Sequence, residues 1–246
     1  MLTVYVAGFP KSGLTWMTRL LGSAYACPTG GWRSDKDSEE IATELIEDRP
    51  NKDMLIRKGH YIPTFDFNEP AVNSVMRLNI PTVEEAEDKI IIMVRDPRDI
   101  TVSATYYWNS TFEDMYKDLI QGKGHFRALG SWSDYYSNWL DADTSNKTFI
   151  KYEDLLLDPK KELGFIEGFL FTPMHKDLEL VIQENSIVNM RNKIMLNPTK
   201  FNLGSEFNLR FLRKGISGEH TKVLPKKYSA RVKVMSKFIM SKFGYD

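Results

Sequence analysis

The sequence predicts a three-layer α/β protein, in which helices cover both faces of a central, mostly parallel sheet. Two observations lead to this prediction. Short segments rich in β-branched and apolar residues have the length of strands, and segments with helical periodicity lie between them. Strands that alternate with helices build parallel sheets, because parallel neighbours need a crossover connection. The length of 246 residues suits a single domain over residues 1–246.

Four strands are expected along the chain. In each, apolar residues, many of them β-branched, predominate over a short run, which is typical of strands buried in a sheet. Turn-forming residues at Pro28–Gly31 predict a loop that is too short to separate two domains. The expected strands are Leu2–Ala7, Met54–Arg57, Lys89–Val94 and Thr148–Lys151.

Seven helices are expected between and after these strands. Pro97 suits the first position of a helix, where the missing N–H costs nothing. Val232, Met235, Ile239 and Phe243 recur at a spacing that places them on one helix face. The expected helices are Gly13–Tyr25, Ser38–Asp48, Pro97–Trp108, Ser131–Leu140, Pro159–Leu170, His175–Glu184 and Pro225–Phe243.

Composition argues against several classes of protein. An aromatic content of 12% with 27% charged residues is typical of a folded chain rather than a disordered one. No apolar run reaches about 18 residues, so no membrane span is expected. No basic segment precedes the first strand, so no secretory signal is expected. The single cysteine, Cys27, cannot form an intramolecular disulfide, and we expect a reducing, cytoplasmic location.

The formal net charge is zero, but the charges are unevenly distributed. The segment Asp35–Asp88 has 14 acidic and 6 basic residues, whereas Ser186–Asp246 has 13 basic and 3 acidic residues. A net charge of zero argues against a protein that coats nucleic acid, so no nucleic-acid partner is expected. The asymmetry is consistent either with an anion-binding region or with two solvated faces.

The turn between the first strand and the first helix is suited to an anion. Glycine and serine in this turn leave backbone N–H groups at the helix N-terminus, and Lys11 adds a full positive charge. The spacing of Gly8 and Gly13 is that of a Walker A loop, so a P-loop kinase is one interpretation. That motif needs lysine directly after its second glycine, however, and Leu14 stands there instead. A turn without a ligand is the other alternative.

Two further groups of residues can hold an anion. Arg95 ends the third strand, and Ser103 lies eight residues later, about two turns into the next helix. Arg213, Lys214 and Gly215 form a basic turn in which glycine permits close approach of an anion. Taken singly, an ion pair of Arg95 with a neighbouring aspartate, or a basic surface loop, would explain these residues equally well.

Lys58 and His60 follow the second strand, at the sheet edge where ligands of parallel sheets collect. A histidine with a pKa near neutrality is the usual general base for a hydroxyl group. A lone histidine is more often structural, and this remains the alternative for His60. The other histidines, His125, His175 and His220, have no comparable setting in the sequence.

The stretch Phe9–Trp16 resembles the 5′-phosphosulfate loop of sulfotransferases that use 3′-phosphoadenosine 5′-phosphosulfate (PAPS). In that family the loop usually reads Tyr-Pro-Lys-Ser-Gly-Thr-Thr-Trp. In this chain Phe9 replaces the tyrosine and Leu14 replaces the first threonine. The resemblance implies a P-loop NTPase-like fold, and it assigns phosphosulfate contacts to Lys11, Ser12, Gly13, Leu14, Thr15 and Trp16.

The resemblance extends to the 3′-phosphate of the cofactor. Arg95 and Ser103 match the family's arginine and the serine eight residues on. Arg213, Lys214 and Gly215 match the Arg-Lys-Gly element that closes over the same phosphate. The motifs occur in family order from Lys11 to Gly215, and this ordered set is far more specific than any motif alone.

The resemblance also assigns residues to the adenine. Tyr152 matches a family tyrosine that contacts the base, and Ser186 and Met190 match an adenine-side stretch. Ile187 replaces the aromatic residue of that stretch. The implied cofactor is therefore PAPS, with 3′-phosphoadenosine 5′-phosphate (PAP) as its desulfated product and no metal.

A mechanism of in-line sulfuryl transfer to a hydroxyl or amine acceptor follows from the resemblance. His60, which matches the histidine of the family's Lys-x-His element, is the expected general base. Lys11 and Lys58 are expected to stabilise the leaving phosphate, and Ser103 completes the expected catalytic set. A P-loop kinase and a non-catalytic nucleotide-binding module remain the alternatives.

The acceptor is expected to be a small molecule, and several aromatic residues could give it an apolar pocket or belong to the core. The family's dimer motif does not match Thr221–Lys227, so the family dimer is not expected and the oligomeric state is left open. These aromatic residues are Tyr61, Phe65, Phe67, Tyr106, Tyr107 and Trp108.

Overall fold

The computed structural model describes residues 1–30, 51–64, 76–79, 87–196 and 212–245. The helix expected at Ser38–Asp48 and the aromatic residues Phe65 and Phe67 lie outside the described residues.

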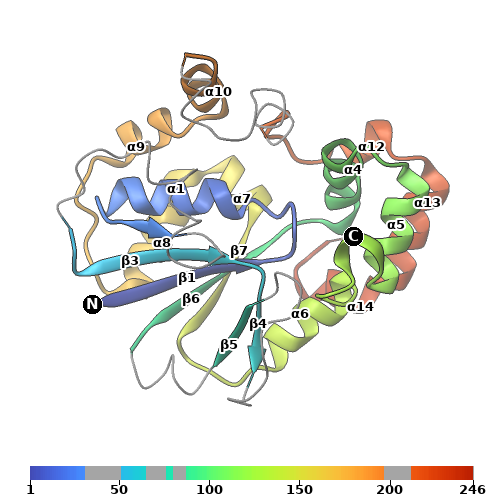
Figure 1. The fold of residues 1–246 in the computed structure, drawn as a ribbon, viewed down its shortest axis with the longest axis horizontal. Helices are drawn as coiled ribbons and strands as arrows, with labels where there is room; N and C mark the ends of the chain where they lie inside the picture. The colour runs from blue at the N-terminus through green and yellow to red at the C-terminus, as the bar shows by residue number, and fades with distance from the viewer. Residues whose placement is uncertain (31–50, 65–75, 80–86, 197–211, 246) are drawn as a thin grey trace.

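The described residues form a central sheet of five strands in the order β2-β3-β1-β6-β7, and every neighbouring pair is parallel (Figure 1). The predicted α/β class with a mostly parallel sheet is confirmed. The four expected strands are present, and a two-residue strand stands where a loop was expected. The strands are β1 Leu2–Gly8, β2 Thr29–Gly30, β3 Met54–Gly59, β6 Lys89–Val94 and β7 Lys147–Lys151.

Strand β6 shows why both faces of the sheet carry helices. Ile90, Ile92 and Val94 point into one buried cluster, while the alternate residues Ile91 and Met93 point into the other. The strand is therefore apolar on both sides, as expected for the centre of a parallel sheet.

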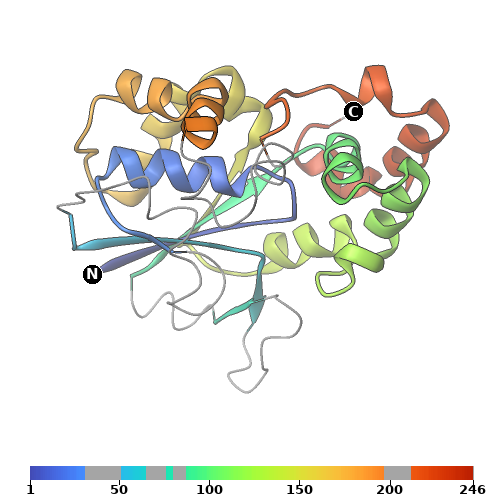
Figure 2. The same cartoon turned by 45° about the horizontal axis from the view of Figure 1, so that its top comes forward.

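Each of the two clusters is closed by its own set of helices (Figure 2). One face is covered by α1 Leu14–Ala24, α7 Tyr152–Leu157, α8 Pro159–Leu170 and α9 Leu178–Glu184. The other is covered by α4 Pro97–Trp108, α5 Phe112–Gln121, η1 Gly124–Phe126, α6 Trp132–Asp141, α13 Lys226–Met235 and α14 Lys237–Lys242. Two further helices, α10 Ile187–Leu196 and α12 His220–Val223, and a parallel pair of strands, β4 Tyr61–Thr64 and β5 Met76–Asn79, complete the described elements.

The cluster that contains Ile90, Ile92 and Val94 buries several aromatic residues whose hydroxyl or indole N–H group is hydrogen-bonded. Tyr135 and Trp139 of α6 both donate to the backbone carbonyl of Tyr61, at 2.8 and 3.1 Å. Tyr136 donates to the carbonyl of Met93 at 2.7 Å. These bonds fix α6 to β4 and to the end of β6. The hydroxyl of Tyr61 and the indole N–H of Trp132 are buried without a hydrogen-bond partner among the described residues. Tyr61 is 1% exposed and is a core residue.

Two local expectations differ from the structure. The helix expected over Pro225–Phe243 is broken at the buried Ser236, where α13 ends and α14 begins. Val232 is buried before the break, and Ile239 and Met240 are buried after it. Met235, which was expected on the same helix face as Val232, is 63% exposed. Helix α5 was missed, although Thr111 accepts a hydrogen bond from the N–H of Asp114, three residues later, as helix N-caps do.

The core predicts the cost of truncating an apolar residue. Leu20 of α1 is fully buried in the cluster that contains Ile91 and Met93. Leu20→Ala should therefore lower the free energy of unfolding by about 2–5 kcal/mol. Leu157, the last residue of α7, is 85% exposed, and Leu157→Ala should change stability by less than about 0.5 kcal/mol. Urea denaturation of both variants measures the difference, and equal losses would contradict this description of the core.

Candidate active site

A cavity of about 790 Å³ lies where β1, β3 and β6 end and the following segments begin. This is the edge at which parallel sheets bind ligands. The sequence-predicted site residues come from widely separated segments, and all of them except Ser12 line this cavity. They are Lys11, Gly13, Leu14, Thr15, Trp16, Lys58, His60, Arg95, Ser103, Tyr152, Ser186, Met190, Arg213, Lys214 and Gly215.

The turn after β1 presents the start of α1 to the cavity. Helix α1 begins at Leu14, and its N-cap residue Gly13 supplies no side-chain cap, so no side chain satisfies the first-turn N–H groups. Lys11 and Gly13 have left-handed backbones, with φ of 70° and 97°. A Cβ added to Gly13 would lie 2.6 Å from the Tyr152 ring, so glycine is required there for two reasons. This geometry favours a bound anion.

Ser12 has a different position from the one expected. Its hydroxyl donates to the carbonyl of Phe9 at 2.6 Å, its N–H donates to the same carbonyl at 3.2 Å, and its side chain is fully buried. Ser12 therefore closes the turn and does not present its hydroxyl to the cavity.

Two lysines give the cavity an excess of positive charge. Burial, and then the charges of Arg95 and Arg213, lower the pKa of Lys11 to about 7. Burial, and then the charge of Arg19, lower the pKa of Lys58 to about 8, and Lys58 donates to the Thr15 hydroxyl at 3.1 Å. Lowered lysine pKa values mean that the charged forms are costly until a negative charge arrives.

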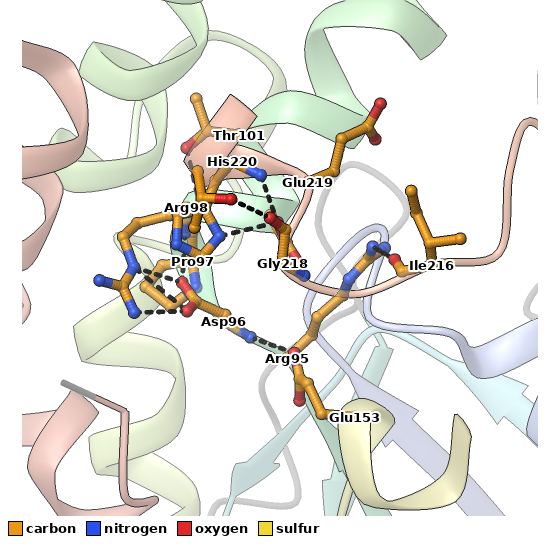
Figure 3. A network of polar contacts seen from close by, with 12 residues as sticks. Arg95, Asp96, Pro97, Arg98, Thr101, Glu153, Ile216, Gly218, Glu219 and His220 are labelled. Carbon is orange, nitrogen blue, oxygen red and sulfur yellow. Dashed lines mark hydrogen bonds and ion pairs between the residues drawn. The ribbon is translucent and has the colours of Figure 1, made fainter. Parts of the chain in front are cut away.

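Arg95, which is 8% exposed, joins two sides of the cavity (Figure 3). It donates to the carbonyl of Lys11 and to that of Ile216, both at 3.0 Å, and its guanidinium stacks on Tyr152 at 4.3 Å. Its buried Nε has no hydrogen-bond partner among the described residues. A buried donor without a partner is costly, and an anion in the cavity is a suitable acceptor.

The aspartates beside Arg95 are engaged elsewhere, so the alternative ion pairs of Arg95 are wrong. Asp96 binds Arg98 through an ion pair of 2.6 Å and also caps α4. Asp99 accepts a hydrogen bond from His220 at 2.9 Å.

The basic turn at Arg213 closes the same end of the cavity. Arg213 makes a two-pronged ion pair with Glu219 and lies over the Tyr106 ring at 4.4 Å. Lys214 donates to Glu219 at 2.7 Å. Gly215 has a left-handed φ of 63°, and an added Cβ would lie 2.8 Å from Ile187.

An aromatic and apolar group forms a separate part of the lining. The rings of Trp16 and Tyr152 meet edge to face at 5.9 Å, and the Trp16 indole N–H donates to the carbonyl of Asn185 at 3.1 Å. Ser186 and Met190 follow at the start of α10, which Figure 1 shows above α1. The group suits a flat ring such as a nucleobase.

The protonation state of His60 is set by one backbone carbonyl. Its Nδ1 lies 2.8 Å from the carbonyl oxygen of Gly8, which can only accept, so Nδ1 carries the proton and the lone pair is on Nε2. Burial lowers the pKa of His60 to about 4, against the hydrogen bond to Gly8, and the charges of Lys58 and Lys11 act in the same direction as burial. At neutral pH His60 is therefore a neutral imidazole whose lone pair is on Nε2.

A second set of aromatic residues lines the cavity. Trp108 and His125 stack at 4.3 Å with their planes only 6° apart. Tyr107, Ala128 and Leu129 continue this wall, and Lys11 lies 3.6 Å from the Tyr107 ring centroid. The sequence offered Tyr107 and Trp108 as pocket candidates but gave no signal for His125. Tyr106, also a candidate, is 44% exposed and does not line the cavity.

Residues 3–244 match the sequence model of the sulfotransferase domain family. The chain belongs to this family. The predicted membership of the sulfotransferase family is confirmed. The prediction of a PAPS-dependent sulfotransferase is confirmed with it, at the level of the family.

Curated relatives agree with this assignment. Sulfotransferase 2A1 of Macaca fascicularis is 23% identical over 235 residues, which cover 88% of this chain and 76% of the relative. Human sulfotransferase 2B1 is 27% identical over 230 residues, which cover 88% of this chain and 60% of the relative. The chain thus spans only part of the length of these sulfotransferases.

Solved structures have the same fold. Mouse sulfotransferase SULT7A1, complexed with PAP, aligns over 98% of this chain and 85% of its own, with a TM-score of 0.67 and 23% identity. Retinol dehydratase, in complex with androsterone and inactive cofactor PAP, aligns over 99% of this chain and 81% of its own, with a TM-score of 0.63 and 16% identity. The P-loop-like sulfotransferase fold that the motifs implied is therefore confirmed.

Neither a membrane-spanning helix nor a cluster of metal-ligand side chains is present among the described residues. Among those residues, no helix has the length and apolar character needed to cross a membrane. The same part of the chain contains no group of three or more histidine, cysteine, aspartate or glutamate side chains able to hold a metal ion.

The lowered pKa of His60 predicts a pH-dependent stability. Between pH 6.5, the usual pKa of histidine, and about pH 4, the unfolded chain binds a proton at His60 that the folded protein does not bind. This contribution should therefore lower the free energy of unfolding as the pH falls through that range. His60→Asn should remove it, so the stability difference between the two proteins should change with pH. Denaturation at several pH values measures this effect, and an NMR titration of the His60 ring near pH 6.5 would contradict it.

Proposed function

We propose that the cavity binds PAPS and that the protein transfers its sulfuryl group to the hydroxyl or amine of a small acceptor, with His60 as the general base of an in-line displacement. The observation that carries the proposal is the convergence, in one cavity, of cations from several segments with a neutral histidine whose lone pair is on Nε2. Because β1 and the C-terminal helices pack into the same described core, we also propose one domain over residues 1–246.

The residues present fit a cofactor with two separate anionic groups. The uncapped start of α1, with Lys11, Gly13, Leu14 and Thr15, would hold the 5′-phosphosulfate. Support comes from the lowered pKa values of Lys11 and Lys58, which bound negative charge would restore. Bound PAPS supplies the activated sulfuryl group.

The other anionic group is the 3′-phosphate. Arg95, with its unpartnered Nε, would hold it together with Ser103, Arg213, Lys214 and Gly215. Tyr152 lies beneath Arg95, and Trp16, Ser186 and Met190 lie close enough to the same end of the cavity to receive the adenine. Ser12 would support the phosphosulfate loop from behind, because its hydroxyl and its N–H both donate to the carbonyl of Phe9.

His60 can take the proton of the acceptor at Nε2. The carbonyl of Gly8 then stabilises the positive charge that forms on the ring, because it accepts the hydrogen bond from Nδ1. Burial lowers the pKa of His60 most, and the charges of Lys58 and Lys11 lower it further, so anionic charge beside these lysines would raise that pKa. The same lysines would stabilise the leaving phosphate.

The wall of Tyr107, Trp108, His125, Ala128 and Leu129 supports a flat, largely apolar acceptor. Aromatic stacking favours planar groups, and few charges line this part of the cavity. The retinol dehydratase structures, one with androsterone and one with retinol, are consistent with an acceptor of this kind.

The direct experiment is transfer of labelled sulfate from PAPS to a mixed panel of phenols, alcohols, lipids and sugars. We expect transfer to flat apolar compounds that carry a hydroxyl group. Thermal stabilisation by ATP without any response to PAP would instead support a kinase, and tight PAP binding without turnover on the panel would support a binding module.

The role of His60 is tested by His60→Asn. The asparagine amide can occupy the position of Nδ1 and keep the bond to Gly8, but it supplies no base at the position of Nε2. We expect turnover to fall by about 10²–10⁴-fold, the usual contribution of a general base, while the affinity for PAP stays nearly unchanged. Calorimetric PAP binding and the transfer assay measure the two effects.

A matched control is His175→Asn, which changes an exposed histidine that does not line the cavity. It should leave both turnover and PAP affinity unchanged. Full transfer activity in His60→Asn would exclude His60 as the base.

A further inference from the structure

The basic turn of Arg213 and Lys214 is tied to the start of α4 by a buried carboxylate. Asp99, which is 1% exposed, accepts the backbone N–H of Gly218 at 2.6 Å and that of His220 at 2.9 Å. The ring of His220 donates to the same carboxylate at 2.9 Å. Figure 3 shows Gly218 and His220 beside the first turn of α4.

This attachment adds to the one made by Arg95, which lies two residues before α4. Arg95 holds the carbonyl of Ile216 at 3.0 Å, so alternate backbone positions at Ile216, Gly218 and His220 are bound by Arg95 and Asp99. Asp99 and Ser103 are four residues apart on α4 and therefore lie on the same face of the helix. The carboxylate thus sets the distance between Ser103 and the basic turn.

A second buried carboxylate holds the cationic side chains themselves. Glu219, which is 4% exposed, binds both terminal nitrogens of Arg213 and also Lys214, at 2.7 Å. Hydrogen bonding from Arg213, opposed by burial and supported by Lys214, lowers the pKa of Glu219. Burial raises the pKa of Asp99, but the bonds from His220 outweigh it and the pKa lies below its ordinary value. Both groups are therefore anions at neutral pH.

Two buried anions beside a site for a phosphate need a physical reason. Each repels a bound anion, and each is costly to bury unless strong donors surround it. The donors to Glu219 are Arg213 and Lys214 of the basic turn, and the donors to Asp99 are Gly218 and His220, which follow that turn. Their benefit is that the turn is already ordered before a ligand binds, so less conformational entropy is lost on binding.

We propose that Asp99 and Glu219 are positioning residues for the 3′-phosphate of the cofactor. Asp99 holds the backbone of the turn at a fixed distance from Ser103, and Glu219 aims Arg213 and Lys214. Neither carboxylate contacts the phosphate. The inference rests on the proposed function, which assigns the 3′-phosphate to this end of the cavity.

The experiment compares PAP with adenosine 5′-phosphate (AMP), which lacks only the 3′-phosphate. Isosteric Asp99→Asn and Glu219→Gln should each weaken PAP binding by about tenfold or more, since each removes hydrogen bonds to a charged group. AMP binding should stay within about twofold, because AMP does not use this end of the cavity. Isothermal titration calorimetry measures both affinities for each protein.

Matched controls are Asp141→Asn and Glu179→Gln. Both residues are exposed and lie outside the cavity, and Glu179, like Glu219, forms an ion pair with a lysine. They should keep the wild-type preference for PAP over AMP. Equal weakening of PAP and AMP in the Asp99 and Glu219 variants would indicate a merely structural role and overturn the proposal, as would unchanged PAP binding.

Two measurements keep the outcomes separate. The wild-type protein is measured first, and if it binds PAP no more tightly than AMP, the proposed function fails rather than the positioning roles. If Asp99→Asn does not fold, His220→Phe removes one donor to Asp99 and leaves both backbone bonds. It should weaken PAP binding by about threefold with AMP unchanged, and an unchanged PAP affinity would overturn the role of Asp99.

Discussion

The architecture of the site depends on the pair of hydrogen bonds by which Arg95 joins the carbonyls of Lys11 and Ile216. Lys11 is in the turn after the first strand, and Ile216 is in the C-terminal part of the chain. A guanidinium is suited to this position because it is always charged and its donors diverge within one plane. Stacking on Tyr152 fixes that plane. Without Arg95 the two walls of the cavity would no longer be hydrogen-bonded to one shared side chain.

Around Arg95 the protein buries several positive charges close together, which costs free energy. The low pKa values of Lys11 and Lys58 show that the buried cations are only marginally stable as charged groups. Asp99 and Glu219 hold the basic turn but do not line the cavity, and no carboxylate is among its described lining residues. The lining therefore favours a bound anion, which agrees with the proposed cofactor.

The sequence predicted the composition of the site well, because motifs that follow parallel strands converge on one edge of the sheet. It could not predict contacts that depend on the tertiary structure. Ser12 turns inward because Phe9 offers a carbonyl, and Asp99 binds donors more than a hundred residues away. The helix break at the buried Ser236 is not marked by the spacing of the apolar residues around it. The stacked His125 was missed because a single histidine in a three-residue 3₁₀ helix has no periodic signature.

The partner that selects the tautomer of His60 is a main-chain carbonyl rather than a side chain. No substitution at position 8 can delete that carbonyl, so the hydrogen bond that sets the tautomer of His60 does not need a particular side chain there. Side chains larger than glycine there would collide with Ser12 and Leu14, at 2.6 and 2.8 Å from an added Cβ. A side chain at position 8 would therefore disturb the turn after β1 and, with it, the position of the carbonyl to which His60 is bonded.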